Sequence, residues 1–280
     1  MVDLSWNHFG PVPGLDPEAR AFAERIYYEL KAAFPAFVAD FESKFGVWRR
    51  RWFDVQASSS ADSVLECCEL PEYDAVLLLG PKTIPLVVYE LCNPQNSFAT
   101  VLYNHLETDP AVKVSPKDVL NYLTLDRQAN LIVELNHERA QQAQAGIEAW
   151  RRQTQTGRQR RAVEDKTCHV SEEDAQHPDL DMSSAEHAAL VGMGPGIVAH
   201  IMLAYAADRS GPWWRVMHQL VCEKPAAAVE EEGDTKEGEQ QQQYERWRRW
   251  FEHMEHHEAA EGLNPEYLRR MGMPAASGGM

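Results

Sequence analysis

Apolar residues recur at helical spacing along most of the chain. Phe22, Ile26, Leu30 and Phe34 are each four residues apart, which places them on one face of a helix. Asp16 precedes this stretch and is followed directly by a proline and a glutamate, a pattern typical of a helix start. The pattern therefore predicts a helix that begins after Asp16.

Further helices are predicted between proline breaks. Pro35 separates the first helix from a second one over 37–52, because proline cannot donate the backbone hydrogen bond that a helix interior needs. Two or three short helices are expected over 72–107, a long one from a capping-box start at 115 to about 153, and a last one over 244–258. No segment alternates with a period of two, so we expect a nearly all-helical chain.

One stretch of the sequence resembles another at an offset of 114. Residues 72–81 align with 186–195, including a glutamate, the following apolar positions and a Gly-Pro pair. Each copy predicts a helix, a Gly-Pro turn, a second helix, a polar turn and a third helix. Because neither copy can bury its apolar stripes alone, the copies should pack on each other or on neighbouring helices. The expected fold is all-α, with two HEAT-like helical repeats and long flanking helices; chance similarity between two amphipathic helical pairs is the alternative.

The remaining stretches lack an apolar pattern. We expect a flexible arm at 1–15, a single helical domain over 16–260, and a flexible tail at 261–280. Mobile inserts are expected near 154–183, which is Arg-rich and then acidic, and near 224–243, which is rich in Glu and Gln.

The net charge of the chain limits the classes of partner that we expect. The chain has 43 Asp and Glu against 27 Lys and Arg, a formal charge of −16, so it is not expected to bind nucleic acid. The most apolar stretch, 75–91, contains Lys, Glu and two Pro and is too short to span a bilayer, so no membrane span is expected. The first residues do not form a secretory signal, and five cysteines with one adjacent pair form no disulfide framework. A cytoplasmic protein is the expectation.

Familiar cofactor motifs are absent from the sequence. It contains no Gly-x-x-x-x-Gly-Lys loop, no Gly-x-Gly-x-x-Gly after a strand, no Gly-x-Ser-x-Gly elbow and no Asp-rich diphosphate motif. We therefore expect no cofactor and no metal.

The second copy carries the strongest candidate site. If its two apolar helices are antiparallel neighbours, His200 and His218 line one cleft and act as general acid or hydrogen-bond donor. The substrate-binding walls of that cleft would come from Trp213, Trp214, Met217 and Tyr205. The alternative is that the tryptophans are core and the histidines lie at its edge.

The first copy holds Glu90, Tyr103 and His105 at related places. A glutamate and a histidine on facing helices can exchange protons with a substrate. The alternative is that these residues form solvated polar faces.

Several segments resemble a family of filamentous-fungal proteins of HEAT-like helical type, some of which are encoded near natural-product biosynthesis genes. The resemblance covers about residues 15–260 and rests on residues 79–81, 103–107, 131–136, 193–205 and 213–221. It implies a fungal intracellular protein and supplies no catalytic residues. By analogy with cofactor-free fungal cyclases, it is compatible with a binder of an apolar small molecule in fungal secondary metabolism, with or without cyclase or isomerase activity. A non-catalytic HEAT-like scaffold that binds another protein is the alternative.

Overall fold

The computed structural model describes residues 14–58, 63–114, 125–167, 184–209, 211–222 and 237–252. Within these ranges every regular element is an α-helix or a short 3-10 helix, and no residue is in a strand. The expectation of an all-α chain is therefore confirmed for the part that the structure describes.

The N-terminal helices follow the capping and proline signals. Helix α1 (Pro17–Ala33) begins where expected: the side chain of Asp16 accepts a hydrogen bond from the Glu18 backbone N–H at 3.0 Å. Helix α2 (Pro35–Ser58) starts after a one-residue break. It packs along α4 (Pro71–Leu77), which follows the short α3 (Ser63–Cys68).

A first group of short elements lies beside α1 and α2. After α4 come η2 (Pro81–Thr83), α5 (Ile84–Leu91), η3 (Pro94–Ala99) and α6 (Thr100–Leu106). Gly80 has a φ of +75° immediately before η2, a conformation that L side chains rarely adopt.

A second group has a similar order of elements, but its described residues contain no counterpart of η3. It consists of α9 (Ala185–Gly192), η4 (Pro195–Ile197), α10 (Val198–Ala207) and α11 (Trp213–Cys222). Helices α9 and α10 and the turn η4 each begin 114 residues after α4, α5 and η2. Gly194 precedes η4 with a φ of +71°, close to the value at Gly80. The two turns η2 and η4 contact each other, so the groups meet at their turns.

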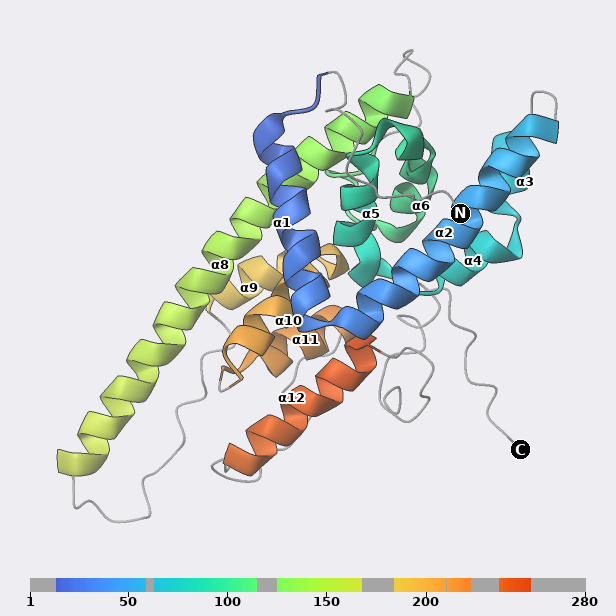
Figure 1. The fold of residues 1–280 in the computed structure, drawn as a ribbon. Coiled ribbons are helices and arrows are strands. Elements are labelled where there is room, and N and C mark those ends of the chain that lie inside the picture. Colours follow the sequence, from blue (N-terminus) through green and yellow to red (C-terminus); the bar gives the residue numbers. More distant parts are fainter. Residues whose placement is uncertain are drawn as a thin grey trace.

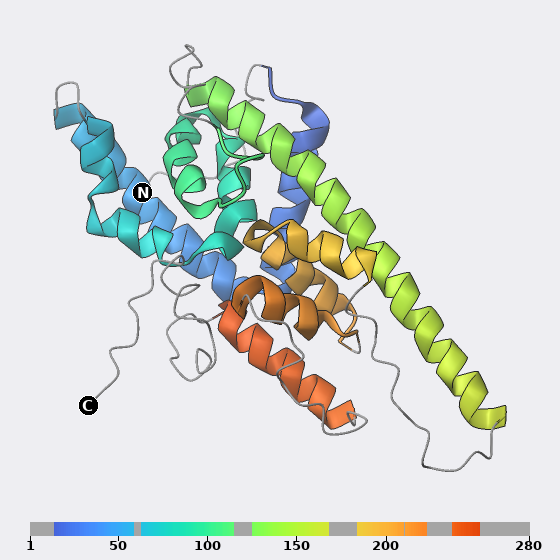
Figure 2. The same cartoon turned by 180° about the vertical axis from the view of Figure 1, so that it is seen from behind.

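Helix α8 (Leu125–Thr167) is the longest element, with 43 residues. It contacts α1, α5 and α6 of the first half and α9 and α10 of the second (Figures 1 and 2). We expected a linker from Thr154, but the helix continues to Thr167, because Gln, Arg, Ala and Glu are good helix formers and no proline interrupts them. In both views its last turns extend beyond the other described helices.

Helix α12 (Glu237–Glu252) closes the fold by packing on α2, α10 and α11. It begins inside the stretch 224–243, which was expected to be a mobile insert. Glutamine is compatible with a helix, and burial of Trp247 and Trp250 stabilises this one. The predicted arm (except Gly14 and Leu15), the start of the long helix at 115–124, the rest of both inserts and the tail lie outside the described residues.

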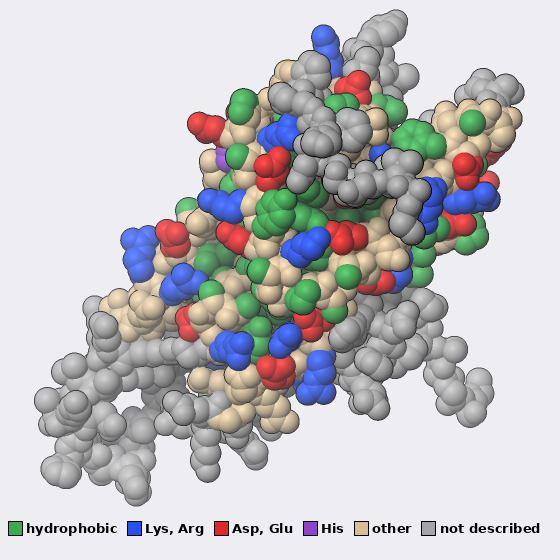
Figure 3. Space-filling view, in the orientation of Figure 1, with side chains coloured by type: hydrophobic (Ala, Val, Ile, Leu, Met, Phe, Trp, Pro, Cys, Tyr) green, Lys and Arg blue, Asp and Glu red, His purple; other side chains and the backbone are tan. Residues whose placement is uncertain are grey.

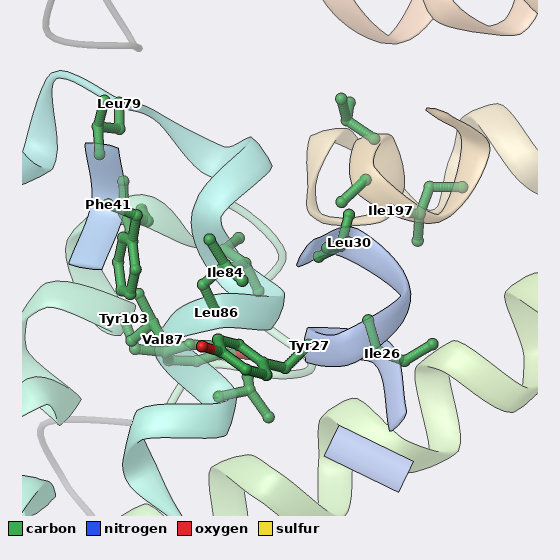
Figure 4. Packing of buried hydrophobic residues seen from close by; sticks show 14 of the residues in the cluster. Ile26, Tyr27, Leu30, Phe41, Leu79, Ile84, Leu86, Val87, Tyr103 and Ile197 are labelled. Carbon is green, nitrogen blue, oxygen red and sulfur yellow. The ribbon is translucent and has the colours of Figure 1, made fainter. Parts of the chain in front are cut away.

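The core runs continuously through both groups of helices. Leu30 of α1 lies toward Ile197 of η4, while Tyr27 turns toward α5 and stacks on Tyr89 with 4.0 Å between ring centroids (Figure 4). On the face shown in Figure 3, basic and acidic side chains are interspersed, so no large patch of a single sign stands out there.

In the described part of the chain, no single helix is both long and apolar enough to cross a membrane, while one pair of helices bent by 96°, Ala185–Gly192 with Pro195–Ala207, reaches that length and composition only together.

Candidate functional site

A groove lies where α1, α5, α8 and α10 meet, and we call it the central groove. It has a cavity volume of about 20 Å³, enough for about one ordered water molecule. No acidic side chain lines it. Most of the lining is apolar, and the polar side chains come from α8 and α10; the complete lining is Ala19, Phe22, Ala23, Ile26, Pro85, Val88, Val133, Asn136, His137, Ala140, Gly196 and His200.

Helices α1 and α8 contribute equivalent faces to the central groove. The lining residues of α1, at 19, 22, 23 and 26, have the spacing of one helical face, and those of α8 lie 114 residues later. The α1 face is entirely apolar, whereas the α8 face carries Asn136 and His137. Of these two helices, only α8 therefore contributes polar side chains to the groove.

His200 is the polar residue that α10 contributes to the groove. Burial and the positive charges of Arg139 and Arg25 together lower the pKa of its imidazole to about 4. The side chain is consequently neutral at pH 7, with one N–H donor and one nitrogen acceptor. Its ring makes no hydrogen bond to another residue in the described ranges. The hydrogen-bonding capacity of His200 is therefore not used by the residues that the structure describes.

Asn136 is, by contrast, fully engaged. Its Nδ2 donates to the Tyr103 hydroxyl at 2.7 Å and to the Ile132 carbonyl at 2.8 Å, and its Oδ1 accepts from Arg139 Nη2 at 2.7 Å. Arg139 Nη1 donates to Glu107 Oε2 at 2.6 Å, and both of these charged side chains are buried. This network fixes the amide and leaves little of it for a ligand.

Gly196 allows the Arg139 guanidinium to lie directly against the turn η4. A Cβ added at position 196 would be only 2.5 Å from Arg139 Nη1, so any larger residue would displace the arginine. The glycine-rich run before α10 thus serves the buried Arg139–Glu107 pair as well as the turn.

The structure separates His200 from the other candidates of the second copy. Trp213 is fully buried, with its ring 5.0 Å from that of Trp150, and Met217 and Tyr205 are also core residues. Trp214 and His218 are half-buried. His200 lies on the face of α10 directed at α1 and α8. The other five candidates do not line the central groove: Tyr205, Trp213, Trp214, Met217 and His218.

The candidates of the first copy have separate hydrogen-bond partners. Glu90 is buried and accepts a hydrogen bond from Asn96 Nδ2 at 2.6 Å; burial raises the pKa of its carboxyl to about 7. His105 is exposed and its Nδ1 pairs with the hydroxyl of Tyr73. Tyr103 alone is connected to the central groove, through Asn136.

Sequence reasoning missed four residues that shape this site: Phe22, Asn136, Arg139 and Glu107. Phe22 has the spacing of an ordinary core residue, and Arg139 lies in a stretch that looks solvent-exposed. The signal available was the matched helical spacing on α1 and α8. Only packing shows that the two faces oppose each other.

Comparison of the chain with protein-family models, with curated proteins and with solved structures yields no match. The resemblance to a fungal family therefore stays a prediction. Among the described residues, no group of three or more His, Cys, Asp or Glu side chains is arranged to hold a metal ion.

Proposed function

We propose that the protein binds a small, largely apolar molecule in the central groove, with His200 as its polar contact. The observation that carries this proposal is an imidazole that makes no hydrogen bond to a described residue, in a groove whose lining is mostly apolar. His200 is half-buried, and an unused hydrogen-bonding group in such a groove is a good position for a ligand atom or a water molecule.

Ligand entry requires Phe22 to move, because the groove holds about one water molecule as it stands. Phe22 is half-buried, and its ring lies 5.1 Å from the ring of His137 and 4.7 Å from the guanidinium carbon of Arg25. A change of its rotamer would open the groove at the surface of α1 without unfolding a helix. We therefore propose a ligand of about the size of a single aromatic ring.

We also propose a catalytic role for the central groove, in which His200 assists a reaction of the bound molecule. A neutral imidazole orients a carbonyl or hydroxyl group and relays a proton, which is the help that a cofactor-free cyclisation or isomerisation needs. Such a role fits an accessory enzyme of fungal secondary metabolism.

The duplicated order of elements favours the second candidate, a HEAT-like scaffold for another protein. We propose that α4–α6 and α9–α11 are copies of one unit, supported by the matching starts and by the glycines at +75° and +71°. However, the copies meet at η2 and η4, and α1 and α8 each contact both of them, rather than the copies stacking side by side as solenoid repeats do. That arrangement favours a groove between helices over an extended binding surface.

A ligand-dependent shift in thermal stability tests the proposed binding function. Indole, used as a small aromatic probe of two fused rings, should raise the melting temperature of the wild type, because a ligand at about 100 times its Kd adds about 2.7 kcal/mol to the stability. His200→Ala should abolish most of this shift. Phe22→Ala should increase it, since removing the ring enlarges an apolar cavity.

His218→Ala is the matched control, because it removes a half-buried histidine from a helix that does not line the groove. Its shift with indole should equal that of the wild type. The proposal fails if indole has no effect on either the wild type or Phe22→Ala, or if the His218 variant loses as much as the His200 variant.

A further inference from the structure

We infer that the ligand of the central groove carries a single carboxylate on an apolar body. This inference rests on the proposed function and specifies its ligand class. The groove combines an apolar lining with two imidazoles, and no Asp or Glu side chain of the described residues contributes to that lining.

The charges around His200 are positive on two sides. Arg25 approaches from α1, and Arg139 approaches from α8 against Gly196. Helix α5 presents only Pro85 and Val88, which carry no charge. The field that disfavours a proton on His200 equally favours an anion beside it.

Of the two arginines, Arg25 is held less firmly by its neighbours, so its side chain can move toward a ligand. Its side chain is about half-exposed (52%), and its Nε lies 3.8 Å from Glu29, a loose ion pair along α1. Such an exposed pair contributes little to stability, so it constrains the arginine weakly. Arg139, by contrast, is held by Glu107 and Asn136.

The hydrogen-bond inventory also supplies donors for a ligand that accepts. Both donor hydrogens of Asn136 are used within the protein. His137 Nε2 lies 2.9 Å from Gln141 Nε2; when the amide donates, the imidazole keeps its proton on Nδ1. Neutral His200 supplies a second N–H. A carboxylate has two acceptor oxygens and no donor, so it matches two imidazole N–H groups.

Binding of a carboxylate would change the protonation of His200. An anion in contact with the imidazole favours its cationic form, so one proton passes from the solvent to His200 and the carboxylate receives a charge-assisted hydrogen bond. The titratable or charged groups that face His200 are Arg25 from α1 and His137 and Arg139 from α8. A neutral alcohol would bind without this proton uptake.

The test compares benzoate with benzyl alcohol, which have the same ring and differ in charge. Isothermal titration calorimetry near pH 6, in two buffers of different ionisation enthalpy, gives both the affinity and the protons taken up. Benzoate should bind about tenfold more tightly than benzyl alcohol, a difference of about 1.4 kcal/mol. Only benzoate should take up protons.

Arg25→Gln should weaken benzoate binding about threefold or more and leave benzyl alcohol unchanged, because it removes a nearby positive charge from a partly exposed position. Arg20→Gln is the matched control: Arg20 lies on the same helix in a similar pair with Glu24 at 2.9 Å, but its charge does not act on His200. It should change neither affinity.

The outcomes separate the two proposals. If benzyl alcohol binds as tightly as benzoate, or if Arg25→Gln and Arg20→Gln have equal effects, the carboxylate inference is wrong and the binding function stands. If neither compound binds the wild type or Phe22→Ala, both proposals fall.

Discussion

The turns η2 and η4 differ in how each accommodates a buried positive charge. Lys82 and Gly196 are 114 residues apart, and each is the second residue of a 3-10 turn that begins at the proline of a Gly-Pro pair. Both turns adjoin a buried cation. At η2 the turn itself supplies the cation, whereas at η4 the glycine leaves space for Arg139 from α8.

The two cations have different partners. Arg139 is paired with the buried carboxylate of Glu107. Lys82 Nζ instead donates to the backbone carbonyls of Phe251 at 2.5 Å and Trp250 at 3.4 Å, at the end of α12 where helix carbonyls lack intrahelical partners. It forms no ion pair with a carboxylate of the described residues. Burial consequently lowers the pKa of Lys82 to about 7. Arg139 thus has a counter-charge within the core, whereas Lys82 is held by helix carbonyls alone.

Removing the carboxylate from the Arg139 pair should produce the largest effect. Glu107→Gln leaves the guanidinium buried without its counter-charge, and we expect a loss of about 3–5 kcal/mol in the free energy of unfolding at pH 7. Urea denaturation measures it.

Glu72→Gln provides the control, since Glu72 pairs with half-exposed Arg51 at 3.5 Å and should cost less than about 1 kcal/mol. Equal losses in the two variants would contradict the view that η4 depends on a buried ion pair.

Lys82 should make stability depend on pH. The folded pKa of about 7 lies below the ordinary lysine pKa of 10.5, so the unfolded chain binds more protons between these two values. The free energy of unfolding should therefore rise from pH 7 toward pH 10, by an amount on the order of a few kcal/mol, and be insensitive to this group below pH 7.

Lys82→Met should flatten that rise, as denaturation curves at pH 6, 8 and 9.5 would show. A wild type and a variant with parallel pH profiles would mean that Lys82 stays charged in the folded protein.

The glycines before the two turns should give a smaller and nearly equal effect. Gly194→Ala should cost about 1–2 kcal/mol, because alanine is strained at a φ of +71° although space is available, with Thr108 Oγ1 3.9 Å from the added carbon. Gly80→Ala should cost a similar amount.

Gly192→Ala is the matched control. Gly192 ends α9 with nothing within 4 Å of an added Cβ, so alanine there should be neutral or stabilise the protein. Thermal unfolding compares the three variants. A strongly unequal cost at Gly80 and Gly194 would show that the two turns are not equivalent.

The sequence predicted the helices best where local signals act. The cap at Asp16, the break at Pro35 and the Gly-Pro turns all depend on backbone geometry and hydrogen bonding within a few residues. Prediction failed at 154–167 and 237–243, where polar composition suggested mobility. A polar stretch without proline can remain helical when it extends an established helix, because propagation needs no new nucleus.

Of the site residues that the sequence suggested, only His200 lines the central groove. Its expected companions were Trp213 and His218 rather than Phe22 and Asn136. Which face of α10 is directed at α1 depends on packing between residues about 180 positions apart in sequence, and helical periodicity cannot determine that.

The sequence by itself determined the helical class and the Gly-Pro turns, because these follow from short-range sterics and the period of apolar residues. Tertiary structure alone decided that α1 and α8 oppose each other across a groove, that Arg139 reaches Glu107, and that Lys82 is buried under α12. These features result from long-range burial, in which a charged side chain takes the partner that the packed core leaves within reach.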